Sequence, residues 1–162
     1  MKQQIEIERS WLISSSAELS QIINDITPRN ILTGMVNPLG SGMPYIRYRS
    51  DKGKFTLDSK TPDPNNELVR LETNSEITEN EFEQGMQTVA EIYDESRYEI
   101  QIADGLVAEL KVYSGELTGC NVIEVEFENV QQSDNFTPPN WFGKEITGMD
   151  VIEIFKQFRE QN

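Results

Sequence analysis

The sequence predicts an α+β protein in which about eight strands form a barrel-like antiparallel sheet with about three flanking helices. Several segments alternate apolar residues with charged residues, which is the period-two pattern of strands with one apolar and one charged face. Other segments space their apolar residues as on one side of a helix. If such a sheet closes on itself, its charged faces converge into a polar interior.

The first strand carries the clearest example of this alternation. In Ile5–Arg9, Glu6 and Glu8 fall on one face of the strand and the two isoleucines fall on the other. Two neighbouring carboxylates repel each other, and a buried face does not tolerate them unpaired. The pattern therefore indicates a divalent cation or a basic group beside Glu6 and Glu8.

The same alternation recurs on later strands. Charged residues two apart flank an apolar residue at Arg47/Arg49, Arg70/Glu72, Arg97/Glu99, Glu109/Lys111 and Glu124/Glu126. An ordinary solvent-facing surface explains any one of these strands. Their repetition, mostly as Glu and Arg, indicates instead that the charged faces meet in a tunnel rich in both acids and bases.

The expected strands follow one another through the chain. They cover Ile5–Arg9 and residues 29–37, 44–50, 54–60, 67–74, 96–103, 106–113 and 121–128. Hairpin turns are expected at Asp51–Gly53 and at Asp104–Gly105, and residues 61–66 are expected to form a polar loop.

Three helices are expected between these strands. Ser14–Ser16 can cap a short helix that stops near Pro28, and Thr78 can cap a helix that runs to about residue 92. A last helix is expected from about residue 149 to 160. No linker or repeat divides the chain, so residues 1–162 are interpreted as a single domain.

Charge and residue usage exclude several classes of function. The chain has 14 Lys and Arg against 28 Asp and Glu, a formal net charge of −14, which argues against a general nucleic-acid binder. The chain has no His, so His-based metal sites and Ser-His triads are absent. The single Cys120 rules out an internal disulfide. No apolar run is long enough for a membrane span and no signal peptide is evident, so we expect a cytoplasmic protein.

Against this background, the chain resembles the CYTH domain, or triphosphate tunnel metalloenzyme, family over most of its length. Ile5–Arg9 resembles the family's opening Glu-x-Glu-x-Lys, and the pairs Arg47/Arg49 and Arg70/Glu72 resemble its Arg-x-Arg and Arg-x-Glu strands. Arg97 resembles the start of its second half. Gly115–Gly119, Glu124–Phe127 and Trp141–Thr147 are similar, in order and spacing, to the tail of its short bacterial members.

The resemblance implies an eight-stranded antiparallel tunnel that binds a triphosphate and one or two divalent cations, Mg²⁺ or Mn²⁺. The implied catalytic and metal-binding residues are Glu6, Glu8, Glu124 and Glu126. The implied phosphate-binding residues are Arg47, Arg49, Arg70 and Arg97, with Lys60 from the same face as Asp58 as an added base. Glu72, Lys111 and Glu145 are expected to support them. Homodimers are common in the family.

The chain also departs from the family pattern. Ser10, Asp58 and Glu95 stand where the family commonly has Lys, and Lys111 stands where it has an acid. If these side chains line the tunnel, its positive potential is weaker than in a typical member. The loss of one point charge at a phosphate site removes about 2–3 kcal/mol of transition-state stabilisation.

Two functions from different classes remain open at this point. One is metal-dependent hydrolysis of a triphosphate, such as inorganic tripolyphosphate or a nucleoside or thiamine triphosphate, with cyclisation of ATP as a variant. The other is non-catalytic binding or sequestration of a phosphorylated small molecule or nucleotide. The paired acids favour the enzyme, whereas the lost lysines favour the binding protein. A third option is a scaffold whose acidic surface docks a basic partner.

Overall fold

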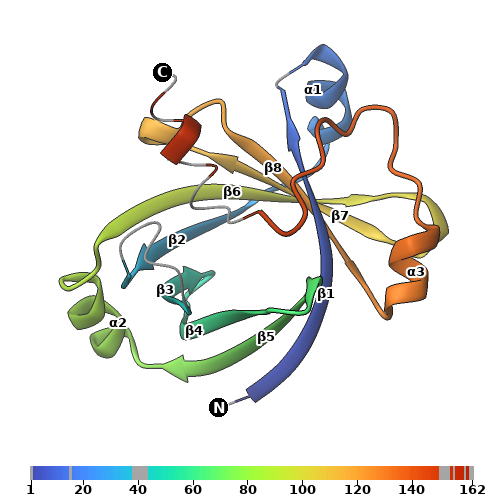
Figure 1. Cartoon of the computed structure of the whole chain (residues 1–162). Helices are drawn as coiled ribbons and strands as arrows, with labels where there is room; N and C mark the ends of the chain where they lie inside the picture. The colour runs from blue at the N-terminus through green and yellow to red at the C-terminus, as the bar shows by residue number, and fades with distance from the viewer. Residues whose placement is uncertain are drawn as a thin grey trace.

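In the computed structural model, eight antiparallel strands close into a barrel, which confirms the predicted fold class (Figure 1). The structure describes residues 2–14, 16–37, 44–149, 154, 156–158 and 160. The strands are β1 (Lys2–Ile13), β2 (Arg29–Met35), β3 (Tyr45–Asp51), β4 (Lys54–Asp63), β5 (Asn66–Ile77), β6 (Glu91–Gln101), β7 (Val107–Tyr113) and β8 (Asn121–Phe127). The α-helices with assigned bounds are α1 (Ala17–Ile23), α2 (Glu79–Met86) and α3 (Val130–Asn135), and Ile154, residues 156–158 and Glu160 are also helical.

The strand order around the barrel is β1-β5-β4-β3-β2-β6-β7-β8, and β1 closes the ring. The first half of β1, from Lys2 to Ile7, pairs with β5, and the second half, from Ile7 to Ile13, pairs with β8. A single long strand therefore joins the two halves of the sheet, and no sheet edge is left between them.

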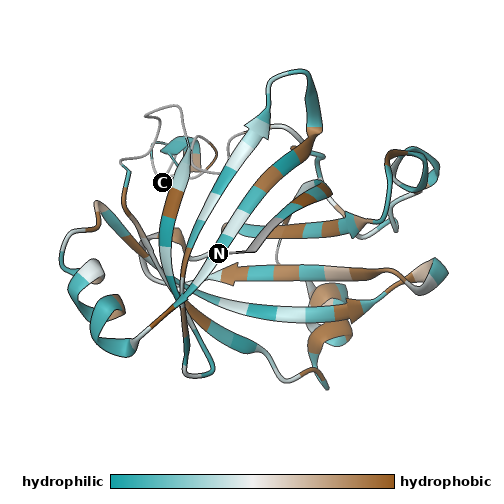
Figure 2. Ribbon diagram, turned by 90° about the horizontal axis from the view of Figure 1, so that it is seen from below, coloured by the Kyte–Doolittle hydropathy of each residue, from teal (hydrophilic) through white to brown (hydrophobic). Residues whose placement is uncertain are grey.

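Apolar side chains on the outer face of β1, β6, β7 and β8 form the main core. Trp11, Leu110, Ile123 and Val125 are almost completely buried there. The alternation of apolar and polar residues along the strands is visible as brown and teal bands in Figure 2. Helices α1 and α3 lie on this side of the barrel, with the segment 136–142 (Figure 1). The main hydrophobic core thus lies outside the barrel wall.

Helix α2 covers the outer face of β3 and β4. The rings of Phe55 and Phe82 lie 5.0 Å apart, and the backbone of Gly85 packs directly against the ring of Tyr48. Thr78 and Glu81 form a capping box at the start of the helix, which confirms the Thr78 cap predicted from the sequence.

A second apolar cluster fills one end of the barrel interior. Its members include Leu12, Met35, Tyr93, Tyr113 and Val122, which lie on the inward-facing sides of five strands, and Ile146 and Ile154 pack against them. Within the described residues, the polar part of the interior is therefore bounded at this end.

The segment that follows Trp141 lies against the second half of β1. Leu12 donates its N–H to Lys144 O at 2.8 Å, and Ile146 donates to Ser10 O at 2.8 Å. Gly143 sits where a side chain would overlap the carbonyl oxygen of Leu12. Only glycine permits this close approach of two backbones.

Some sequence-based boundaries are wrong. The helix expected from Thr78 to about residue 92 ends at Met86, because Ala90 N donates to Met35 O at 2.7 Å and β6 begins at Glu91. Backbone pairing within the sheet thus overrides the local helical pattern.

Two further differences concern segments in which no strand or helix was expected. Residues 61–66 belong mostly to β4 and β5, which meet in a tight turn where Asn65 N donates to Asp63 Oδ1 at 2.8 Å. The segment before Pro139 contains α3, capped by Asn129. Residues 38–43, between the strands expected at 29–37 and 44–50, lie outside the described residues, as does half of the helix expected at 149–160, of which Ile154, residues 156–158 and Glu160 are helical. None of the described helices is long and apolar enough to cross a membrane.

Substitution of Gly143 by Ala should destabilise the protein by about 3 kcal/mol, because the new methyl group meets fixed backbone rather than a movable side chain. Urea unfolding measures the effect. Gly105→Ala is the control, since Gly105 has a φ of 71° but open space around its Cα and should lose only about 1 kcal/mol. Equal losses for the two variants would contradict this account of Gly143.

Candidate functional site in the barrel interior

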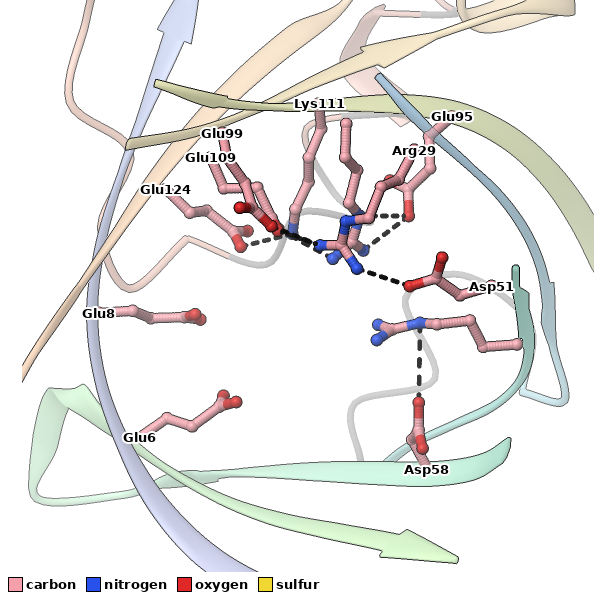
Figure 3. A network of polar contacts seen from close by, with 12 residues as sticks. Glu6, Glu8, Arg29, Asp51, Asp58, Glu95, Glu99, Glu109, Lys111 and Glu124 are labelled. Carbon is pink, nitrogen blue, oxygen red and sulfur yellow. Dashed lines mark hydrogen bonds and ion pairs between the residues drawn. The ribbon is translucent and has the colours of Figure 1, made fainter. Parts of the chain in front are cut away.

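The inward faces of the strands bring the charged residues of the sequence pattern into one space. Figure 3 shows Glu6 and Glu8 pointing from β1 into the barrel, with Asp58 and Lys111 entering from other walls. The buried charged residues include Glu6, Glu8, Asp58, Glu72, Glu95, Arg97 and Lys111. The predicted tunnel of acids and bases is therefore present, and its members contact one another directly.

Glu6 and Glu8 are neutralised by bases from β4 and β5. Lys60 Nζ lies 2.7 Å from Glu6 Oε2 and 3.4 Å from Glu8 Oε2, and Arg70 Nε lies 3.2 Å from Glu8 Oε1. Burial works against the charge of Lys60, but Glu8 and the neighbouring carboxylates outweigh it and raise the pKa of Lys60. Lys60 thus occupies the position between the two glutamates where a cation was expected.

Glu72 shares this part of the interior with Glu6. Burial and a hydrogen bond with Glu6 raise the pKa of Glu72 to about 7. The pKa of Glu6 is lowered, because the hydrogen bond with Glu72 and the charge of Lys60 outweigh its burial. The two carboxyl groups therefore share a proton near neutral pH, while Arg47 Nη2 lies 3.6 Å from Glu72 Oε1.

On the opposite wall, β6, β7 and β8 hold a tight ionic chain. Arg97 donates to Glu95 Oε1 from Nε at 3.0 Å and from Nη2 at 2.6 Å, and its Nη1 donates to Glu109 at 2.8 Å. Lys111 donates to Glu124. Burial disfavours the charge of Glu124, yet Lys111 and Lys60 outweigh it and hold the pKa of Glu124 well below its usual range. Every base of this wall is committed to a carboxylate.

Arg29 extends this chain to β3. Its guanidinium lies 2.6 Å from Asp51 and 3.0 Å from Glu109 (Figure 3). Arg29 was not among the expected site residues, because the sequence of β2 is otherwise mostly apolar. Its place in the alternation along the strand is the signal that could have identified it. Arg29 lies directly opposite Arg97 in the β2–β6 ladder and therefore shares the interior face.

Arg47 and Arg49 are held much more loosely, on either side of Asp58. Asp58 Oδ2 lies 3.6 Å from Arg47 Nε and 3.7 Å from Arg49 Nε, beyond hydrogen-bond distance. Asn74, also missed by the sequence analysis, donates to the other oxygen of Asp58 at 2.6 Å. Burial and the charges of Arg47 and Arg97 lower the pKa of Arg49 to about 10.

Glu126 completes the acidic side of the interior. It lies directly opposite Glu8 in the β1–β8 ladder, and burial, with the charges of Glu6 and Glu8, raises its pKa. A pocket of about 490 Å³ opens beside it, and its lining includes Glu99, Asp104, Glu109, Glu124, Glu126 and Glu128.

The chemistry of the four predicted metal ligands fits a hard cation, because all four are carboxylates and the crowding felt by Glu126 favours added positive charge. Among the described residues, no three such groups stand together as a ready-made metal centre. Lys60, Arg70 and Lys111 pair with three of the four carboxylates instead. A cation would replace these bases rather than enter a preformed site.

Glu145 and Ser10 are the two remaining positions singled out from the sequence, and of these only Ser10 lies on the inner face. Glu145 lies outside the barrel, where Arg9 donates to it at 2.8 and 2.9 Å from the outer face of β1. Ser10 is buried on the inner face, opposite Glu124, and its N–H donates to Thr147 Oγ1 at 3.1 Å.

Solved structures share the fold of this barrel. The crystal structure of an inorganic triphosphatase is 24% identical, with a TM-score of 0.60 over 88% of this chain and 86% of that chain. A candidate adenylate cyclase from Bacillus halodurans is 18% identical, with a TM-score of 0.65 over 96% and 92%. A candidate adenylyl cyclase from Hippeastrum, with a dominant triphosphatase activity, is 16% identical, with a TM-score of 0.57 over 80% and 82%.

A curated protein is similar in sequence over a shorter stretch. The inorganic triphosphatase of Nitrosomonas europaea is 39% identical over 54 residues, which are 33% of this chain and 36% of that protein. The match therefore spans just over a third of the relative's length. No family model matches the chain.

The raised pKa of Glu72 predicts a pH-dependent stability. Between its ordinary pKa of 4.5 and about 7, the native protein retains a proton that the unfolded chain releases, so this group lowers the stability as pH rises through that window. The unfolding free energy of Glu72→Gln, minus that of the unmutated protein, should therefore rise by about 2 kcal/mol from about pH 5 to about pH 8. Urea unfolding at both pH values measures it, with exposed Glu83→Gln as the control. A difference that does not change with pH would count against the shared proton.

Proposed function

We propose that the protein hydrolyses a triphosphate-containing substrate inside the barrel, with a divalent cation as cofactor. The substrate class is inorganic tripolyphosphate or a nucleoside or thiamine triphosphate. Hydrolysis forms a bond from a water oxygen to a phosphorus atom and breaks a phosphoanhydride bond, so that phosphate and a diphosphate product leave.

The observation that carries the proposal is the loosely held pair Arg47 and Arg49. Both guanidinium groups lie inside the barrel, and neither Nε has a hydrogen-bond partner in the described part of the chain. Buried arginine donors without partners favour an external oxyanion, because guanidinium and phosphate form strong paired hydrogen bonds. The likeness to an inorganic triphosphatase, in fold and over a stretch of sequence, supports the same ligand class.

The remaining bases would contribute in different ways. Arg70 and Lys60 already form ion pairs with Glu8, and both side chains could also interact with an incoming phosphate group. Arg97 is fixed by Glu95 and Glu109, so its charge acts at a distance rather than through a new hydrogen bond. The pair Glu6 and Glu72 holds a proton that can be exchanged with a water molecule or a leaving group.

We place the cation, Mg²⁺ or Mn²⁺, at Glu6, Glu8, Glu124 and Glu126. When bound there, it would neutralise charge on the phosphate oxygens and orient the attacking water. Lys60 and Lys111 pair with Glu6 and Glu124 in this structure, and with a cation bound they would be available to the substrate.

A second candidate function is binding of a phosphorylated small molecule without turnover. The observation that favours it is the tight engagement of Arg97 and Lys111 by Glu95 and Glu124, which removes two bases from a substrate clamp. Cyclisation of ATP is a further outcome that the assay below separates, since two of the structural neighbours described above are candidate adenylate cyclases.

The double variant Glu6→Gln/Glu8→Gln should lose at least about 10²-fold of the metal-dependent phosphate release, because it removes two of the proposed cation ligands. The assay measures phosphate released from tripolyphosphate, ATP and GTP with Mg²⁺ or Mn²⁺, and cyclic AMP in the same samples.

The matched control is Glu18→Gln/Glu83→Gln, which removes two charges from exposed positions on α1 and α2 and should retain full activity. Absence of turnover in the native protein, together with a ligand-induced rise in melting temperature, would replace the hydrolase by the binding function. Activity that survives the double variant would exclude this cation site.

A further inference from the structure

Three polar atoms on the walls formed by β2, β3 and β4 lack the partners that their burial requires. Arg47 Nε, Arg49 Nε and Thr33 Oγ1 are buried and have no hydrogen-bond partner among the described residues. Thr33 is 7% exposed and lies directly opposite Arg49 in the β2–β3 ladder, so both side chains are on the inner face. Unpartnered buried donors are costly and rare in native proteins, which indicates a ligand that supplies the acceptors.

Asp58 stands between the two arginines but does not satisfy them. It is 1% exposed, its Oδ2 has no hydrogen-bond partner, and its distances of 3.6 and 3.7 Å to the two Nε atoms allow attraction without hydrogen bonds. Its other oxygen accepts from Asn74, which fixes its position on β4.

Two arginine–glutamate pairs of the chain show what a structural ion pair with two hydrogen bonds looks like here. Arg9 donates two hydrogen bonds to Glu145, at 2.8 and 2.9 Å, and Arg97 donates two to Glu95, at 3.0 and 2.6 Å. Asp58 neutralises Arg47 and Arg49 without taking their donors. An arrangement built for stability alone would use those donors.

We propose that Asp58 is a resident counter-ion of the phosphate-binding subsite already assigned to Arg47 and Arg49, where it limits the affinity for phosphate groups, and that Thr33 adds a donor to this subsite. The inference rests on the proposed function for the class of ligand, a phosphate oxyanion, but not for turnover. The incoming group accepts hydrogen bonds from the two guanidinium groups and from the Thr33 hydroxyl. The Asp58 carboxylate repels this group and so lowers the affinity.

The test is the affinity for inorganic tripolyphosphate measured by calorimetry in the presence of EDTA, where no cation-dependent turnover occurs. Asp58→Asn keeps the shape and the acceptor for Asn74 but removes the charge, so it should bind at least about tenfold more tightly than the native protein. Thr33→Val should bind severalfold more weakly, because it removes one donor to a charged acceptor.

The matched control is Asp134→Asn, the same change at an exposed position on α3, which should leave the affinity unchanged. Native-like or weaker binding by folded Asp58→Asn overturns the proposal, as does a gain of the same size in Asp134→Asn. If Asp58→Asn is unfolded without ligand, inorganic phosphate should restore its circular dichroism and cooperative melting. Failure to restore them also overturns the proposal.

This experiment separates the inference from the proposed function. Tighter binding by Asp58→Asn, with no phosphate release by the native protein under any metal, supports the subsite and rejects the hydrolase. Phosphate release by the native protein, with unchanged affinity in Asp58→Asn, supports the hydrolase and rejects the counter-ion.

Discussion

Charges enclosed by a sheet have to be neutralised by other charges within it, and this constraint governs the arrangement of the barrel. Period-two alternation sends one side chain in two to the interior, and closure by β1 brings the inward faces of all eight strands together. Since removal of an unpaired charge from water is very unfavourable, each carboxylate needs a base within reach. The ion pairs from Lys60 to Glu6 and from Lys111 to Glu124 meet this need across different pairs of strands.

Different walls of the barrel meet this constraint to different extents, and this difference gives the interior its chemical character. The wall formed by β6, β7 and β8 is saturated, because the donors of Arg97 are used by Glu95 and Glu109. The wall formed by β3 and β4 is not saturated, because Arg47 and Arg49 share the one carboxylate of Asp58 and keep donors without partners within the described residues. A rigid, saturated wall can position an unsaturated one, which is the general requirement for a preorganised binding site.

Much of this arrangement was predictable from the sequence, and the remainder depended on register. The inward placement of Glu6, Glu8, Arg47, Arg49 and Lys60 follows from alternation alone, because the period of a strand is fixed. The identity of each ion-pair partner does not follow, since it depends on pairings between strands that are distant in the sequence.

The errors in secondary structure have the same origin. The residues after Met86 carry a helical pattern, but they are needed to begin β6 beside β2. The short helix α3 was missed because its signal is confined to one cap, in which Asn129 accepts from Gln132 N, and its burial is provided by β1 and β8. Local patterns therefore identified the faces of the strands better than the ends of the elements.

The acidic pocket has a kinetic consequence. Its lining carries Glu99, Asp104, Glu109, Glu124, Glu126 and Glu128, and the whole chain has a net charge of −14. A polyanion that comes near this pocket is repelled by its carboxylates, and added salt screens that repulsion. Basic surfaces have the opposite effect, because they attract an anionic ligand from a distance. The carboxylates of the pocket therefore slow the approach of a polyanion to this face of the barrel and do not capture it.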